Sequence, residues 1–229
     1  MQEMSANTTV SEQAFQALRH DVLSGRHAPE CKLKLDALQN LYGFSSSPLR
    51  EALNRLVQEG LVKADERRGF RVTPISPADL SDITKMRLML DIPALTDAIR
   101  AGDDAWEAHI VAAFHRLEKI ESRLPQGPVT LDFEWSQRHR DFHFSLIAAC
   151  PSERQLAWSM SLFDQAERYR HFAARNRTVS KKKDSEHRAL MNAVVRRDAK
   201  TAALLLSEHI ASTQTNVMAA FKQQAKQRG

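Results

Sequence analysis

The sequence predicts a mainly α-helical protein in two parts, and three observations lead to this prediction. Four of the seven glycines and four of the eight prolines lie within residues 1–77, whereas residues 152–228 contain neither. Since both residue types mark turns, we expect short elements first and long helices afterwards. Apolar residues recur at helical spacing through both parts. Two short alternating segments, 61–64 and 70–73, flank a charged turn and predict a β-hairpin.

Three helices are expected before this hairpin. The apolar pattern places them over residues 11–23, 35–41 and 45–59. From Leu49 onward, the third helix has apolar residues at i, i+3, i+4, i+7 and i+8, which is typical of a helix buried on one side. Pro48 is tolerated only in a first helical turn, so it marks where this helix starts. Three helices and a hairpin in this order indicate a winged helix-turn-helix over residues 11–75, preceded by a disordered arm at 1–10.

A winged helix-turn-helix would place its third helix in the major groove of DNA. Arg50 is the preferred base reader, because a guanidinium can bond guanine O6 and N7 together. Hydroxyls at the start of this helix suit a phosphate, and the basic hairpin tip suits the minor groove or its phosphates. The candidate DNA contacts are Ser46, Ser47, Arg50, Asn54, Arg67, Arg68 and Gly69. The alternative is an ordinary amphipathic helix followed by a solvated basic turn.

Composition is compatible with this interpretation. The chain has 229 residues, of which 42% are hydrophobic and 27% charged, so a globular core is expected without a disulfide framework. A net charge of +5 and a pI near 9.4 permit nucleic-acid binding. We expect no membrane span, no secretory signal and two reduced thiols, Cys31 and Cys150, which together suggest a cytoplasmic protein.

The remainder of the chain predicts about six helices. Ser76 is expected to cap the first of them, with Pro77 at the first helical position. Pro93 should kink or break that helix, because proline lacks an N–H and its ring clashes with the preceding turn. The helical domain is expected over residues 76–221, followed by a solvated tail at 222–229.

Four of the nine histidines lie on apolar helix faces. His139 and His143 are four residues apart on one predicted helix, and His187 and His209 lie on the apolar stripes of two others. Three helices would therefore direct imidazoles into the bundle, and convergent imidazoles suit Zn, Ni or a similar divalent metal. The alternative is a set of hydrogen-bonded core histidines.

The N-terminal third resembles the DNA-binding domain of GntR-family bacterial transcription regulators. The resemblance rests on Tyr42-Gly43, Ser45 through Leu53, Glu59-Gly60-Leu61 and the wing Arg67 through Val72. The family often has Arg at the position of Ser46, so the usual operator sequence is not expected here. Arg50 is retained.

Residues 75–221 resemble the all-helical ligand-binding domain of the FadR subfamily, the FCD domain. The resemblance rests on Arg87 to Asp91, Phe142-His143, Glu186-His187-Arg188 and His209. Many members have Asp or Asn where this chain has His139, so the implied metal ligands are His139, His143, His187 and His209, with Asp141 as a fallback. Four imidazoles are neutral, and the metal's full charge would favour an anionic ligand.

The resemblance implies a ligand-responsive transcription regulator rather than an enzyme, acting as a homodimeric repressor on operator DNA. Its effector would be a small organic acid of carbon metabolism, such as a dicarboxylate. Arg87 is the candidate second contact for a carboxylate, because guanidinium binds carboxylate bidentately, and Arg168 and Arg170 are further candidates. The alternatives are a regulator that senses the metal itself, and a metal-dependent hydrolase with a DNA-binding appendage in which Glu186 would be a base.

Overall fold

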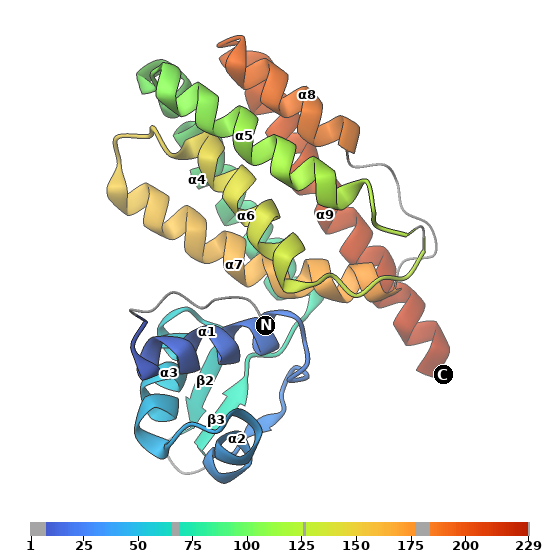
Figure 1. Cartoon of the computed structure of the whole chain (residues 1–229). Coiled ribbons are helices and arrows are strands. Elements are labelled where there is room, and N and C mark those ends of the chain that lie inside the picture. Colours follow the sequence, from blue (N-terminus) through green and yellow to red (C-terminus); the bar gives the residue numbers. More distant parts are fainter. Residues whose placement is uncertain (1–7, 66–68, 126, 177–183, 229) are drawn as a thin grey trace. The chain divides into compact units, whose positions relative to one another are not determined.

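The computed structural model describes residues 8–65, 69–125, 127–176 and 184–228, and it divides the chain into two compact units (Figure 1). The first unit is residues 1–75 and the second is residues 76–229. The expected disordered arm falls mostly on residues outside the described part. Thr9 accepts a hydrogen bond from the Glu12 amide and so caps the first helix, which begins at Val10.

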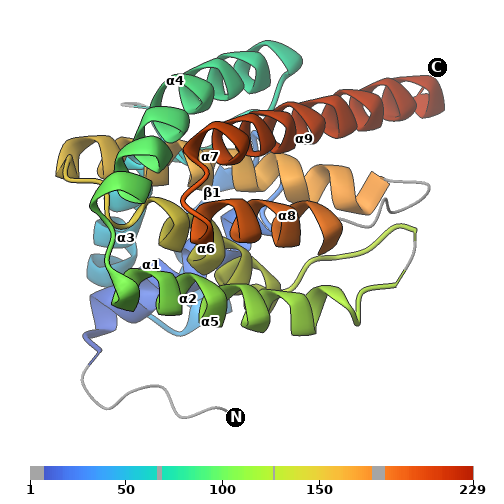
Figure 2. The same cartoon turned by 90° about the horizontal axis from the view of Figure 1, so that it is seen from above.

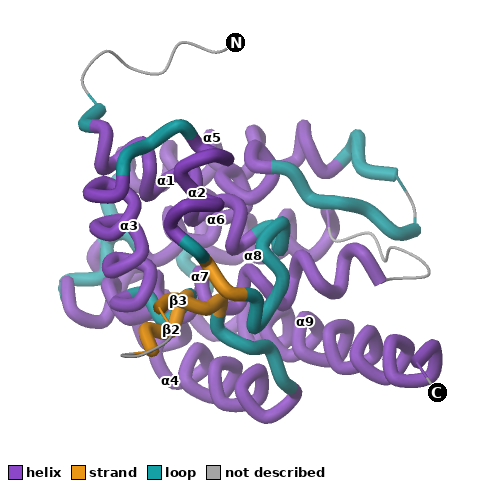
Figure 3. The backbone as a smooth tube through the Cα atoms, turned by 90° about the horizontal axis from the view of Figure 1, so that it is seen from below, coloured by secondary structure: helices purple, strands orange, loops and turns teal. Residues whose placement is uncertain are grey.

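The N-terminal unit is a three-helix domain with a small antiparallel sheet, the winged helix-turn-helix that the sequence predicts. Its elements are α1 (Val10–Leu23), β1 (Lys32–Leu33), α2 (Leu35–Tyr42), α3 (Ser46–Gln58), β2 (Val62–Asp65) and β3 (Gly69–Val72). The strands follow the order β1-β3-β2, and strands are orange in Figure 3. The hairpin pairs Val62 with Val72, and β1 adds Lys32 opposite Arg71. The sequence did not predict β1, because two residues are too few to show an alternating pattern.

The α3 helix has the buried stripe that its apolar spacing predicts. Leu49, Leu53 and Leu56 have no exposed surface and pack against Phe15 and Leu18 of α1 within one core. Gly43 ends α2 with a φ of 73°, a conformation that favours glycine, so the turn into α3 is tight. The opposite face of α3 therefore remains exposed.

The C-terminal unit is a bundle of six helices within its described residues. They are α4 (Pro77–Ala101), α5 (Asp104–Glu121), α6 (Phe133–Ile147), α7 (Glu153–Asn176), α8 (Asp184–Val195) and α9 (Ala199–Arg228). The α6 helix packs against α4, α5 and α7, while α8 lies between α5 and α9 (Figure 2). The predicted cap is confirmed, since Ser76 accepts a hydrogen bond from the amide of Asp79. Asp103 caps α5 in the same way by accepting from the amide of Trp106.

Two features of this unit refine the prediction. Of the two outcomes expected at Pro93, a kink or a break, the break does not occur, because α4 continues through the proline as far as Ala101. Proline has no N–H, so the carbonyl of Met89 loses its hydrogen-bond partner within the helix. Both Pro93 and Met89 are exposed, so water can solvate that carbonyl. The α9 helix runs on to Arg228 rather than ending near residue 221. None of the helices within the described ranges is long and apolar enough to cross a membrane.

One close contact joins α4 to α5. Gly102 follows the last residue of α4, and a Cβ built on it would overlap the six-membered ring of Trp106. That indole is buried, and its Nε1 donates to the carbonyl of Ser145 on α6 at 2.8 Å. The indole therefore has little room to move aside.

We predict that Gly102→Ala destabilises the C-terminal unit by ~1–3 kcal/mol, because a methyl group forced into a packed core displaces its neighbours. All three tryptophans lie in this unit, so denaturant unfolding followed by tryptophan fluorescence measures it. Adding Trp106→Phe should make the glycine substitution less costly. If Gly102→Ala lowers the free energy of unfolding by the same amount with and without Trp106→Phe, the proposed overlap is contradicted.

Candidate metal centre and DNA-binding face

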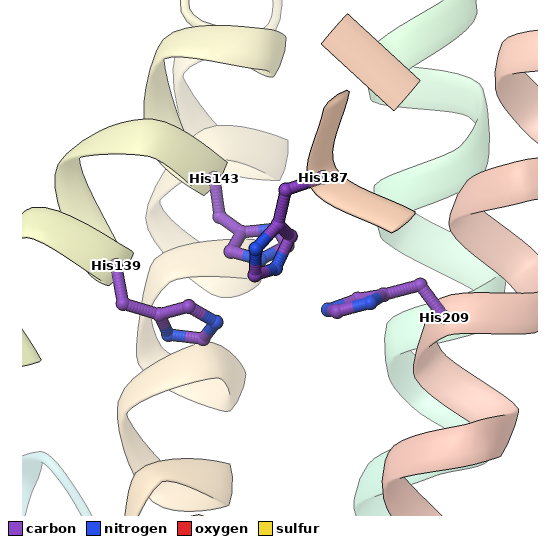
Figure 4. A group of neighbouring side chains, drawn as sticks. All are labelled: His139, His143, His187 and His209. Carbon is purple, nitrogen blue, oxygen red and sulfur yellow. The ribbon is translucent and has the colours of Figure 1, made fainter. Parts of the chain in front are cut away.

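Four histidine side chains converge inside the C-terminal unit, as the sequence predicts (Figure 4). His139 and His143 come from successive turns of α6, and their ring centroids lie 4.6 Å apart. His187 comes from α8 and His209 from α9, with ring centroids 4.9 Å apart. Each histidine offers one nitrogen that lies within 4.8 Å of those of the other three. No side chain of the four is more than 7% exposed.

Aromatic side chains enclose the cluster on the α6 and α7 side. The indole of Trp135, one turn before His139, stacks on that imidazole with centroids 4.5 Å apart and an interplanar angle of 14°. The Phe163 ring lies 5.4 Å from His139 and 5.3 Å from His143. Burial, reinforced by the neighbouring imidazoles, holds the pKa of His139 and His143 well below the usual histidine value. Both rings are therefore neutral at neutral pH, and a neutral ring has a lone pair for a metal.

Two carboxylates orient the other pair of histidines from outside the cluster. Glu121 on α5 lies 3.1 Å from Nδ1 of His187, and Glu186 on α8 lies 3.1 Å from Nδ1 of His209. Because an ionised carboxylate only accepts, Nδ1 is the donor in both contacts, and Nε2 is the nitrogen of each ring that is left to face a metal. Metal-bound histidines in proteins commonly have this arrangement, in which the carboxylate fixes the ring and raises its basicity.

The donor set fits a divalent metal of the Zn or Ni class. Nδ1 of His139 and Nε2 of His143 and His187 are buried and have no hydrogen-bond partner among the described residues. Such nitrogens are costly to bury unless something binds them. Four imidazole nitrogens that all lie within 4.8 Å of one another match the ligand type and number of a four-coordinate Zn site. The cluster could therefore hold a divalent metal.

The fallback ligand Asp141 lies away from the cluster. Its side chain is 42% exposed, and its carboxylate lies 4.0 Å from the guanidinium of Arg138 on the surface of α6. The sequence did not identify Glu121, because no spacing relates α5 to α8. The sequence indicates a base role for Glu186 in the hydrolase alternative, whereas the structure places its carboxylate on Nδ1 of His209. Its position next to His187 is the signal in the sequence that it belongs to the site.

A pocket of about 410 Å³, part of it open to solvent, adjoins the histidines. Most of its wall is apolar, and His143 belongs to both the wall and the cluster. The main apolar contributors are Phe144, Ile147, Met160, Phe163 and Leu206. The polar contributors besides His143 are Arg87, Asp91, Arg140 and Ser159.

The three candidate effector arginines differ in position. Arg87 lines the pocket, but its Nε and Nη2 both lie 3.0 Å from Oδ2 of Asp91, and both side chains are buried. Arg168 is buried with its guanidinium 5.9 Å from the Tyr169 ring centroid. Arg170 pairs with Glu167 and donates to the carbonyl of Phe163. Neither Arg168 nor Arg170 lines the pocket, so of the three only Arg87 is brought to it.

In the N-terminal unit, three of the predicted DNA contacts share one exposed face of α3. Ser47, Arg50 and Asn54 are exposed, while Ser46 is half-buried at the helix start. Gly69 is exposed at the start of β3 with a φ of 82°. Arg67 and Arg68 lie outside the described residues.

Arg55, by contrast, turns back toward α1. Its guanidinium bonds Glu12 at 2.6 Å and lies 3.6 Å from the Phe15 ring centroid. Arg55 therefore stabilises the α1–α3 packing, whereas Arg50 makes no ion pair with any described residue. An exposed arginine without an intramolecular partner is free to contact a base.

Comparisons with known proteins agree with this division. The model of the FCD domain matches residues 82–212, and the model of the bacterial regulatory proteins of the gntR family matches residues 10–72. The chain is 38% identical to the HTH-type transcriptional regulator BphR of Paraburkholderia xenovorans, over 88% of this chain and 82% of that one. It is 35% identical to the HTH-type transcriptional repressor GlaR of Escherichia coli, over 89% and 93%. The fold is similar to that of E. coli McbR/YncC, with a TM-score of 0.75 at 19% identity over 95% and 99% of the two chains.

We predict that Glu121→Gln weakens Zn²⁺ binding by ~10–100-fold, because the His187 ring loses the carboxylate that orients it and raises its basicity. The measurement is a competition titration of chelator-treated protein against a chromogenic chelator. Glu118→Gln is the matched control, since Glu118 lies one turn away on α5 and pairs with Arg188 instead. Equal affinities of the two variants would show that Glu121 does not support a metal ligand.

Proposed function

Because this chain belongs to the GntR family of bacterial regulatory proteins and is a DNA-binding transcriptional regulator with an FCD domain, we propose that it is a homodimeric repressor controlled by a small organic acid. The acid is held at a divalent metal ion bound by His139, His143, His187 and His209. We place the chain in the FadR subfamily and in the cytoplasm, where a bacterial regulator reaches its operator.

The observation that carries the effector part of the proposal is the buried histidine cluster beside an apolar pocket. Four neutral imidazoles leave a divalent ion with its full charge of about +2, in a place where little water screens it. An anion that completes the coordination would lower the free-energy cost of burying that charge. A carboxylate entering through the pocket past His143 meets this requirement.

The DNA-binding part rests on the exposed face of α3. Ser47, Arg50 and Asn54 are spaced so that they face the same way, and the α3 N-terminus offers amides to a phosphate. In a homodimer, two such helices would contact half-sites about one DNA turn apart. The repressor assignment is supported by the name of GlaR, a transcriptional repressor.

Effector binding in the C-terminal unit must change operator affinity for regulation to occur. A coupling free energy of ~1–3 kcal/mol between the two sites is sufficient, and it corresponds to a 5–150-fold change in affinity. The effector must therefore bind one arrangement of the dimer more tightly than the other.

A second candidate function is metal sensing, which the same cluster supports. In that case the metal alone, without an organic acid, changes operator affinity. Titrating chelator-treated protein with Zn²⁺ or Ni²⁺ and measuring operator binding distinguishes the two functions. A hydrolase has no support from the site, because Glu186 is engaged with His209 as an outer carboxylate.

We predict that Arg50→Ala costs ~1–3 kcal/mol of binding to the operator, which we expect in the DNA upstream of the gene. The variant should lose less affinity for random DNA of equal length, because Arg50 makes no specific base contact in that complex. Arg100→Ala removes an exposed charge from the C-terminal unit and is the matched control. Fluorescence anisotropy at one fixed salt concentration measures both DNAs. If specific and random DNA lose the same affinity, Arg50 contacts only phosphate.

We also predict that His187→Ala loses the metal, which should be present in the purified protein at about one ion per chain. The same variant should lose the rise in melting temperature that carboxylates produce by binding the folded state, and it should lose their effect on operator affinity. Operator binding without effector should stay near wild type, since residue 187 lies in the other unit. The exposed His109→Ala is the control. A carboxylate response that survives in His187→Ala would show that the metal does not anchor the effector.

A further inference from the structure

The charges of the pocket wall constrain what the rest of the effector can be. Arg87 is paired with Asp91 through two contacts of 3.0 Å to one carboxylate oxygen. Arg140 is paired with Asp164 through bonds of 2.9 and 3.3 Å. Each guanidinium that lines the pocket is thus balanced by a carboxylate of the same chain.

A dicarboxylate fits this wall poorly. One carboxylate could bind at the metal, but the other would enter a pocket whose two cations are already paired and would approach the carboxylate of Asp91. Like charges at short range in a poorly hydrated pocket repel strongly. Among the described groups of this site, the net positive charge needed to attract an anion would come from a metal ion held by the four histidines.

Two polar atoms in the wall lack a partner. Oδ1 of Asp91 and Oγ of Ser159 are buried, and neither has a hydrogen-bond partner among the residues that the structure describes. Both residues line the pocket and are at most 5% exposed. Groups of this kind are costly to bury unpaired, so a polar atom of a ligand is expected beside them.

The two atoms come from facing turns of α4 and α7. Gln155, one turn before Ser159, donates from Nε2 to the carbonyl of Leu90 at 2.8 Å, and Leu90 precedes Asp91. This bond holds the two helices together at the level of the pocket. Asp91 and Ser159 therefore line the same pocket from two adjoining helices.

A hydroxyl group matches this pair of atoms. It can donate to Oδ1 of Asp91, which only accepts, and accept from the Ser159 hydroxyl. A carboxylate cannot donate, and a methyl group can do neither. An ammonium can donate, but it would bring a second cation next to Arg87 and toward the metal.

We propose that the effector is a hydroxylated monocarboxylate with a hydrocarbon or aromatic body, whose hydroxyl is recognised by Asp91 and Ser159. This inference rests on the proposed function, because the carboxylate is placed at the metal. The apolar body contacts the wall formed by Phe144, Met160, Phe163 and Leu206. Asp91 and Ser159 are then specificity-determining residues, and the Arg87–Asp91 pair recognises a neutral polar group.

The test uses matched probes on the full-length, Zn-loaded protein. The first series shares a five-carbon chain: pentanoate, its 2-, 4- and 5-hydroxy derivatives, glutarate and 5-aminopentanoate. The second shares an aromatic frame: 3-phenylpropanoate, its 4-hydroxy derivative and its 4-carboxy derivative. Melting temperature against probe concentration gives the relative affinities. At least one hydroxylated probe should bind roughly tenfold or more tightly than both its parent and its dicarboxylate.

The second part of the experiment uses the variant Ser159→Ala. It should remove most of the preference for the hydroxylated probe over its parent, while affinity for the parent changes less than threefold. Ser161→Ala is the matched control on α7, because its hydroxyl accepts from Gln165 and does not line the pocket. The probe comparison on wild-type protein stands by itself if Ser159→Ala fails to fold.

The outcomes separate failure of this inference from failure of the proposed function. Tighter binding of glutarate or of 5-aminopentanoate, or equal binding of hydroxylated and parent acids, overturns the hydroxyl assignment while a carboxylate at the metal survives. A hydroxyl preference that persists in Ser159→Ala also overturns it. If no probe changes the melting temperature and Zn²⁺ alone changes operator affinity, the proposed function fails and the inference fails with it.

Discussion

The C-terminal unit depends on one constraint, which is that four imidazoles are buried together with ring nitrogens directed at one another. A helix bundle of this size gains most of its stability from apolar packing, and unpaired polar atoms in its interior oppose that gain. Three buried nitrogens of this cluster accept no hydrogen bond within the described chain. Their burial is physically reasonable when an ion shares them, so folding and metal binding are expected to be linked.

The surrounding charges follow from the same constraint. Glu121 and Glu186 lie outside the ring of imidazoles, where they orient two rings without entering the coordination site. Arg87, Arg140 and Arg170 are paired with Asp91, Asp164 and Glu167, respectively. With these arginines balanced, an ion bound by the histidines would be the main uncompensated charge beside the pocket, and it would favour the anionic end of a ligand.

Each unit contains an amphipathic helix with candidate binding residues, but these residues are exposed in α3 and buried in α6. In α3, an amphipathic helix buries its leucines and leaves Arg50 and Asn54 exposed, because DNA must be contacted from outside. In α6, an amphipathic helix directs His139 and His143 inward, where both are buried. Not every basic residue of α3 faces solvent, since the guanidinium of Arg55 packs on the Phe15 ring.

The sequence by itself determined the helical class, the winged helix-turn-helix and the identity of the clustered histidines, because these follow from local periodicity. His139 and His143 share a face at i, i+4 whatever surrounds them, and His187 and His209 lie on apolar stripes that must face a core. Only the tertiary structure decided that Glu121 contacts His187, that Arg87 is paired with Asp91, and that Arg168 and Arg170 lie away from the pocket. It also decided that α4 continues through Pro93 and that Lys32–Leu33 forms a strand. Partners on different helices are set by how the helices pack, and spacing along one chain segment contains no information about that packing.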